Sequence, residues 1–523
     1  MRVFFLLSLI LLASCRLQEK TKDYTTLYLN LENDPITFNP IVAEDAYSNL
    51  INSKIHESLL KRDVKTLKWK PALAQRYEIS RDHLVYTFFL KKNARFHDGH
   101  PVTADDVIYT FQKIMDPQTP NPFMKVYYQD VQSVEKRGSH TVIFRLKKPY
   151  FKSLEFLGGF EILPKHIFSK QADFVSNPYS LRHPIGAGPY KLKEWKTGQR
   201  IVLVRNEDYH GPKPEIRQYY YRIIKNEAVA LQALKKREID MLNLKPFQWT
   251  RQTNSQNFNR YFQKIKYISG GYRYIGYNTR RFPFTDKRVR RAITMLLDRE
   301  KILASLMDNL GFEVTGPFHM AGNQYDKNLK PLPYDPVAAK KLLAEAGFQL
   351  GKDGILEKEG QKFIFELLIP AAAPFYEQFA SVAREELLKA GIVMEIRKLE
   401  FQVLVEKANK RDFYALMMGW SVPLESDPYQ VWHSSQIERG HNFTGFSRQD
   451  LDALIEKARV DFNEKRRNAL YHKIQRIIYE EQPYTFLYTS YNLIALHRRF
   501  TEVEAYPAGL DPDRWKILYQ WEF

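Results

Sequence analysis

The sequence predicts a mixed α/β protein whose lobes are assembled from interleaved segments of the chain. Residues 84–91 are apolar, aromatic or β-branched and read as a strand, and a capped helix follows them after a turn. Strand, helix and strand patterns then recur at 363–369, 375–389 and 392–398, the alternation of an α/β lobe. The 523 residues show no internal repeat and no flexible linker, which favours interleaved lobes over a string of separate domains.

Composition places the chain among ordinary globular proteins, with 44% hydrophobic and 27% charged residues. The formal net charge is +19, from 79 Lys and Arg against 60 Asp and Glu. The basic residues are spread along the chain without zinc-finger spacing or an RNP-like motif, so we expect no nucleic-acid partner. A weak attraction to anionic envelope polymers is the expected side effect of this charge.

The N-terminus reads as a signal peptide. Arg2 precedes an apolar run from Val3 to Ala13, which is too short to span a bilayer. The sequence Leu12-Ala13-Ser14-Cys15 resembles a bacterial lipobox, and Cys15 is the only cysteine. This resemblance implies that residues 1–14 are removed, that Cys15 is acylated and that residues 15–24 form a tether; an ordinary signal peptide with an incidental cysteine is the alternative.

The first elements are a strand and a helix. Leu27, Leu29 and Leu31 alternate along the strand, which breaks at Asp34-Pro35, and residues 46–61 carry a helical apolar stripe.

Residues 72–112 then contain strand 84–91, a turn at Asp98-Gly99 and a helix that Thr103 caps. Asp105 and Asp106 stand early in that helix, where negative charge is favoured.

The same block raises the alternative of a metal or catalytic site at His97, Asp98 and His100. These residues lie in a turn, no third strong ligand stands nearby, and the chain has no HExxH helix. No GxSxG elbow is present either. The sequence therefore predicts neither a metal site nor catalytic residues.

The central part continues the alternation. Residues 141–146 form a strand, and strands 190–195 and 200–205 flank a Thr197-Gly198 hairpin turn after the glycine-rich turn at Gly186 and Gly188. That turn lacks the spacing of a phosphate loop.

Three further helices are expected. A strand ends at Asn278 and precedes a helix whose Arg288, Arg290 and Arg291 should face outward or toward the lobe boundary. Asp335-Pro336 begins the next helix, and Ser447 caps another.

The amino-acid sequences of several segments resemble those of a known family. FHDGHPVTADDV at 96–107 and the stretches 184–211, 272–300 and 442–459 are similar to extracellular solute-binding proteins of the peptide/nickel class, and the resemblance covers nearly the whole mature chain. It implies a two-lobed, periplasmic-binding-protein-like fold of type II in its large three-domain form, with mixed sheets and a hinge of two crossovers. The implied domains are 25–47, 185–267 and 491–523 (domain I), 48–184 (domain II) and 268–490 (domain III).

The resemblance also implies a function. The chain would be the substrate-binding component of an ABC importer: a monomer without cofactor or catalytic activity, anchored by lipid in the cell envelope, which captures peptides and delivers them to permease subunits. Alternatives left open are a binder of a nickel chelate, haem or another non-peptide solute, an envelope hydrolase, and a surface receptor or chaperone without a role in transport.

Candidate ligand contacts follow from the family blocks. They are Glu44, Asp45 and Tyr47 before the first helix, the turn glycines Gly186 and Gly188, and the late residues Trp420, Glu425, Asp427, Asn442 and Phe443. In dipeptide and oligopeptide binders an Asp three residues after the matching Trp commonly pairs with the ligand's amino group. Here that position holds Pro423, which puts recognition of a free N-terminus in doubt.

Overall fold

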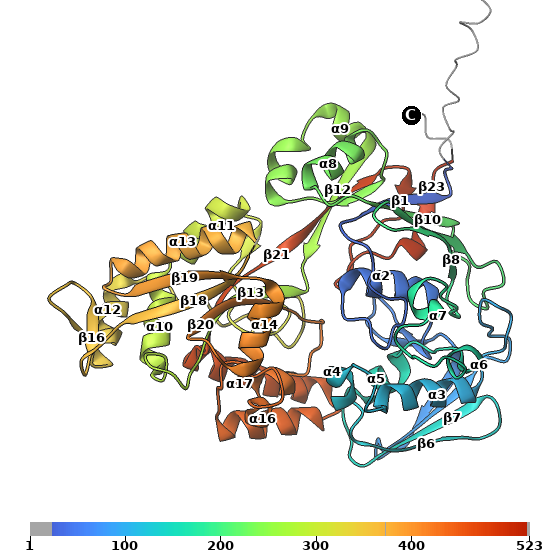
Figure 1. Ribbon diagram of the computed structural model, residues 1–523, viewed down its shortest axis with the longest axis horizontal. Coiled ribbons are helices and arrows are strands. Elements are labelled where there is room, and N and C mark those ends of the chain that lie inside the picture. Colours follow the sequence, from blue (N-terminus) through green and yellow to red (C-terminus); the bar gives the residue numbers. More distant parts are fainter. Residues whose placement is uncertain (1–22, 372, 520–523) are drawn as a thin grey trace, which may run out of the picture.

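A computed structural model describes residues 23–371 and 373–519, which form two lobes joined by strands of one long sheet (Figure 1). The predicted signal peptide, Cys15 and most of the tether lie outside the described residues. Within the described part, none of the helices combines the length and the apolarity that crossing a membrane requires.

The long sheet runs in the order β19-β18-β20-β13-β21-β11-β1-β10-β9-β8. Its pairs are parallel between β1 and β10 and between β18 and its two neighbours, whereas β8–β9 and β13–β21 are antiparallel, so the sheet is mixed. Strand β21 (Tyr484–His497) pairs with β13 at one end and with β12 at the other, and passes from one lobe to the other (Figure 1). Strands β12 and β13 provide the second passage, which agrees with the predicted two-crossover hinge.

The first lobe holds one end of the long sheet and a smaller antiparallel sheet of order β4-β5-β7-β6. Its strands are β1 (Thr26–Leu31), β2 (Leu60–Arg62), β3 (Trp69–Pro71), β4 (Ala74–Ile79), β5 (Val85–Leu90), β6 (Val131–Lys136), β7 (Thr141–Leu146), β8 (Tyr190–Lys196), β9 (Arg200–Arg205), β10 (Gln218–Ile223), β11 (Met241–Asn243), β12 (Phe262–Ile268), β22 (Phe500–Thr501) and β23 (Lys516–Ile517). Its helices are α2 (Ala46–Ile55), α3 (Ala104–Met115), α4 (Pro122–Val126), α5 (Ser153–Gly159), α6 (Lys165–Phe168), α7 (Pro178–Leu181), α8 (Glu227–Lys235) and α9 (Gln256–Tyr261).

The second lobe holds the other end of the long sheet, and helices pack against the sheet there (Figure 1). Its strands are β13 (Gly271–Tyr277), β14 (Gly311–Phe312), β15 (Gln349–Leu350), β16 (Leu356–Lys358), β17 (Gln361–Lys362), β18 (Ile364–Pro370), β19 (Val393–Leu399) and β20 (Ala415–Ser421). Its helices are α10 (Lys287–Leu296), α11 (Arg299–Met307), α12 (Pro336–Glu345), α13 (Pro374–Leu388), α14 (Phe401–Lys410), α15 (Tyr429–Trp432), α16 (Gln449–Arg459) and α17 (Glu464–Glu481). The residue limits given above for three domains stay predictions.

The strand–turn–helix block of the first lobe is as predicted. Tyr86, Phe88 and Leu90 of β5 share one face and are buried. Gly99 closes the turn with a φ of +90°, a conformation that glycine adopts without strain. Asp106 accepts hydrogen bonds from the amide and hydroxyl of Thr103, at 2.8 Å each, and thereby fixes the start of α3.

Two predicted helix ends are wrong. The helix expected over 46–61 ends at Ile55, because His56 is extended and Leu60 instead pairs with Pro71 across β2 and β3. Apolar residues at 59–60 fit a strand as well as a helix, so periodicity alone could not separate them. Helix α16 begins after Arg448 rather than after a Ser447 cap, and the Arg448 side chain makes no capping bond.

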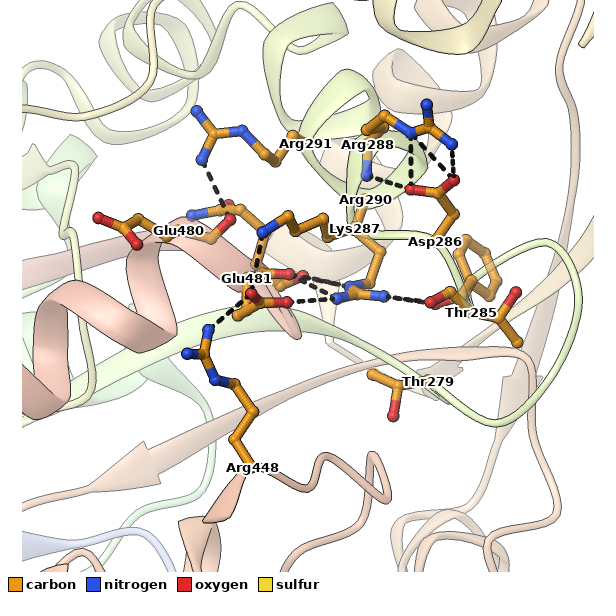
Figure 2. A network of polar contacts seen from close by, with 12 residues as sticks. Thr279, Thr285, Asp286, Lys287, Arg288, Arg290, Arg291, Arg448, Glu480 and Glu481 are labelled. Carbon is orange, nitrogen blue, oxygen red and sulfur yellow. Dashed lines mark hydrogen bonds and ion pairs between the residues drawn. The ribbon is translucent and has the colours of Figure 1, made fainter. Parts of the chain in front are cut away.

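The prediction that three arginines of α10 face outward or toward the lobe boundary is wrong for Arg290, which is only 3% exposed and contacts residues of its own lobe. Its guanidinium donates to the carbonyls of Phe284 (2.6 Å) and of Glu481 (2.7 Å) at the C-terminus of α17, while Lys287 and Arg448 reach the Glu481 carboxylate (Figure 2). Burial lowers the pKa of Arg290 to about 10, so the side chain stays charged at neutral pH. Carbonyls at a helix end lack partners within the helix, and Arg290 satisfies them.

Low pH is expected to destabilise the first lobe, because burial keeps the side chains of His56 and His97 uncharged in the folded protein. Burial lowers the pKa of His56 to about 3 and that of His97 to about 4, from an ordinary 6.5. Below about pH 6.5 the unfolded chain binds protons that the folded chain refuses, so stability should fall by about 1.4 kcal/mol per pH unit for each histidine until its folded pKa is reached. Urea midpoints measured between neutral pH and about pH 4 test this; a flat profile would contradict it, and His56→Gln should give a shallower slope.

Candidate ligand-binding site

A cavity of about 210 Å³ lies between the two lobes. The first lobe contributes Tyr127, Lys152 and Phe156, and the rings of Tyr127 and Phe156 stack with centroids 4.1 Å apart. The second lobe supplies most of the wall: Tyr272, Pro317, Phe318, Trp420, Ser421, Val422, Pro423, Ser426, Asp427, Pro428, Gln430, Val431, Trp432 and His441. Another cavity of about 290 Å³ is lined by first-lobe residues between Glu57 and Arg514, so movement of the lobes would not open it.

Trp420 forms part of the wall on the side of β20. Its ring stacks on Phe443 with centroids 5.8 Å apart and lies 5.5 Å from the ring of His441, and its Nε1 donates to the Tyr484 hydroxyl at 3.4 Å. Phe443 is buried behind it and is not part of the lining. The two aromatic residues predicted as ligand contacts are therefore neighbours, and only Trp420 faces the cavity.

Asn442 fixes the chain next to this stack. Its amide nitrogen donates to the carbonyls of His433 (3.2 Å) and Phe446 (2.7 Å), and its amide oxygen accepts from the Phe446 amide. These bonds account for the complete burial of Asn442. The contact of Asn442 with a ligand stays a prediction, whereas its hydrogen bonds to the loop backbone are present in the structure.

The two acidic residues that follow Pro423 are both engaged by arginines. Asp427 lines the cavity, but its carboxylate accepts from Arg459 Nε at 2.9 Å and from the Tyr150 hydroxyl at 2.8 Å, and its side chain is 4% exposed. Glu425 forms an ion pair with Arg467 and lies outside the lining. The carboxylates that follow Pro423 most closely, those of Glu425 and Asp427, are thus both paired within the protein.

Lys152 and Asp427 are the charged groups of the cavity wall. Lys152 is largely buried; its Nζ lies 2.8 Å from the Glu155 carboxylate and donates to the Glu425 carbonyl at 3.1 Å. Burial, reinforced by the charge of Arg411, lowers the pKa of His441 to about 4, so this imidazole is neutral at physiological pH. Both charges of the wall are compensated within the protein, and the remaining surface is aromatic and weakly polar.

The segment Tyr150-Phe151-Lys152 joins the first lobe to the second. Besides the Tyr150 and Lys152 contacts, the Phe151 amide donates to the Arg459 carbonyl at 2.8 Å. The guanidinium of Arg467 lies 4.5 Å from the centre of the Phe151 ring, and His83 stacks on Phe462 at 3.6 Å. In this arrangement the lobes touch directly beside the cavity. Nothing in the spacing of this segment marks it as a contact between lobes, so it is not predictable from the sequence pattern.

The predicted contacts in the first lobe lie outside this cavity. Asp45 caps α2 by accepting from the amides of Tyr47 and Ser48, the Tyr47 hydroxyl donates to Glu32 at 3.2 Å, and Glu44 is exposed. A ligand role for these residues stays a prediction.

The glycine-rich turn has a clear packing role. A Cβ atom on Gly186 would stand 2.0 Å from the Ile55 carbonyl oxygen, and one on Gly188 2.6 Å from the same atom. Gly188 also donates to that carbonyl at 2.8 Å and accepts from His97 Nε2 at 3.0 Å. Only glycine allows this close approach of turn and helix end. The predicted ligand contact of the two glycines stays a prediction.

Comparison with known proteins decides the family. A model described as bacterial extracellular solute-binding proteins, family 5 Middle, matches residues 68–440. This chain belongs to that family. The match spans the 72–112 block and the wall from Trp420 to Asp427, so the family is defined across both lobes.

Individual relatives extend the match to nearly the whole chain. The chain is 34% identical to the oligopeptide-binding protein AppA of Bacillus subtilis over 492 residues, which cover 91% of this chain and 88% of that protein. The structure of B. subtilis AppA in complex with a nonapeptide superposes with a TM-score of 0.82 at 32% identity, covering 94% of this chain and 99% of the other.

Other similar proteins are described with different ligands. NikZ from Campylobacter jejuni, solved in complex with Ni(L-His), superposes with a TM-score of 0.80 at 26% identity and covers 94% of this chain and 99% of its own. Heme-binding protein A of Haemophilus influenzae is 25% identical over 522 residues, 95% of this chain and 93% of that protein. The fold of this solute-binding protein is thereby established, and its ligand has to be argued from the cavity.

Proposed function

We propose that this solute-binding protein captures peptides between its lobes and delivers them to the permease of an ABC importer. The observation that carries the proposal is an aromatic, charge-compensated cavity whose wall comes from both lobes, since closure over a ligand then buries it completely. About 210 Å³ suits one or two side chains, so a longer peptide would require the lobes to part. AppA, the relative solved with a nonapeptide, supports this ligand class.

Recognition of the ligand is proposed to rely on its main chain and apolar side chains. A peptide backbone presents donors and acceptors that a cleft can pair without reading the sequence. Pro423 offers no carboxylate, and Asp427 is held by Arg459 and Tyr150, so a terminal ammonium group has no free partner in the cavity wall. We therefore expect the N-terminus of the ligand to contribute little affinity.

Native mass spectrometry with a mixed peptide library tests both statements. The chain should retain peptides rich in apolar and aromatic residues, and Nα-acetylated copies should be retained about as well as their free counterparts. Retention of a nickel–histidine chelate or of haem with no peptide would overturn the proposed ligand class and favour the non-peptide solutes that NikZ and heme-binding protein A carry. Loss of binding on acetylation alone would overturn only the account of the N-terminus.

The cellular setting completes the proposal. We infer a monomer without enzymatic activity that Cys15 anchors by acyl chains to a membrane of the cell envelope, with residues 15–24 as tether. The anchor would lie on the periplasmic face of a Gram-negative membrane or on the outer face of a Gram-positive cell membrane. A lone acyl chain holds a protein only reversibly, so stable anchoring requires a multiply acylated cysteine. Metabolic labelling with a palmitate analogue tests this, because label retained by Cys15→Ser would contradict it.

A further inference from the structure

Two histidines and an aspartate from separate segments meet on the surface of the first lobe. Asp98 and His100 lie in the turn before α3, and His166 lies on α6. His166 Nε2 is 2.6 Å from Asp98 Oδ2, and His100 Nδ1 is 3.9 Å from the same oxygen. One ligand atom from each of the three side chains lies within 4.8 Å of the other two.

The scaffold under these side chains is firmly held. Within the turn, Gly99 donates to the Phe96 carbonyl at 2.9 Å, Phe96 donates to the His100 carbonyl at 2.8 Å, and the His100 amide donates to Asp98 Oδ1 at 3.1 Å. The Phe96 ring lies against that of His166 with centroids 5.8 Å apart. The backbone positions of the three groups are thus fixed relative to one another.

The distances are close to those that a bound metal requires. Zinc binds imidazole nitrogen and carboxylate oxygen at about 2.0–2.2 Å, which places tetrahedral ligands roughly 3.3–3.5 Å apart. The Asp98–His166 distance would lengthen by less than an ångström and the Asp98–His100 distance would shorten slightly. The imidazoles now stack at 3.8 Å, so His100, whose side chain is 60% exposed, has to rotate out of the stack to aim a nitrogen at the ion.

We propose that Asp98, His100 and His166 bind a divalent transition-metal ion such as Zn²⁺. Two imidazoles and one carboxylate are the donors that zinc and its first-row neighbours favour, whereas Mg²⁺ and Ca²⁺ prefer oxygen-only sites. Three protein ligands on an accessible surface leave at least one position to water, which makes the ion exchangeable. None of the three residues lines the interlobe cavity, so this site is separate from the peptide site.

Calorimetric titration of the full chain with ZnCl₂, on protein made without a histidine tag, tests the proposal. Wild-type protein should bind one zinc ion per chain, and His166→Ala and His100→Ala should each weaken that binding by at least about tenfold. His183→Ala removes an exposed histidine of the same lobe and should leave zinc binding unchanged. MgCl₂ should give no binding heat.

Three outcomes would overturn the site: no zinc bound by wild type, zinc bound equally by His166→Ala, or a loss of equal size in His183→Ala. Circular dichroism of each variant shows that it is folded, so that lost binding reports on the ligand set. Because the titration contains no peptide, its result is independent of the proposed transport function.

Discussion

Replacing Arg499 with Ala is expected to destabilise the first lobe by about 3–5 kcal/mol, because the buried carboxylate of Asp240 would lose its compensating charge. Arg499 and Asp240 are both fully buried, with Nη2 and Oδ2 2.6 Å apart. The guanidinium also donates to the carbonyls of Tyr24 and Thr26, and Asp240 accepts from the Tyr28 amide. The pair thus ties the first strand of the chain to the segment after β21. Urea unfolding followed by circular dichroism measures the loss.

The neighbouring Arg498 provides a matched control. It is exposed and donates to the Asn259 carbonyl at 2.8 Å, so Arg498→Ala should shift the unfolding midpoint little. Combining Arg499→Met with Asp240→Leu should recover part of the stability, since an apolar pair leaves no charge unpaired. Equal midpoints for Arg499→Ala and Arg498→Ala would contradict the role of the buried pair.

Replacing Trp420 with Ala is expected to weaken peptide binding by about 2 kcal/mol or more, roughly thirtyfold in Kd. The indole forms the cavity wall and stacks on Phe443, so its loss removes contact area and lets water into the site. Isothermal titration with a peptide retained from the library measures the change.

Two variants sharpen this result. Trp420→Phe keeps an aromatic ring against Phe443 and loses only the bond to Tyr484, so it should retain most of the affinity. Trp249→Ala removes a partly buried tryptophan of the first lobe that is not in the lining, and binding should be unchanged. Unchanged binding in Trp420→Ala, or an equal loss in Trp249→Ala, would remove Trp420 from the site.

Individual strands and helices are predictable where the hydrophobic pattern agrees with the turn and capping residues at its ends. The hairpin of β8 and β9 turns at Gly198 with a φ of +70°, and Asp335 caps α12 with a bond to the Ala338 amide, both at the positions that the sequence indicates. Residues 59–60 and Arg290 were not predictable from local periodicity, because their structure depends on partners outside the pattern. Leu60 pairs with Pro71 of the next strand, and Arg290 contacts the end of α17, 191 residues away.

The site was predictable only in part for the same reason. Trp420 and Asp427 were found from the family block, yet Tyr127, Lys152 and Phe156 reach the cavity from the other lobe and carry no signal of their own. His166 likewise stands 68 residues from Asp98, so spacing within the turn could not reveal it as the third member of the cluster. Tertiary contact, rather than local pattern, brings these groups together.

Peptides are proposed to bind between the lobes, against the wall that Trp420 forms. A crystal structure of the protein with the ligand that copurifies with it, identified in parallel by mass spectrometry, tests this binding mode. A peptide should lie between Lys152 and Trp420, with its side chains in the aromatic cavity and its N-terminus unpaired with Asp427. A haem or metal chelate in that place, or a peptide bound elsewhere on the molecule, would contradict it.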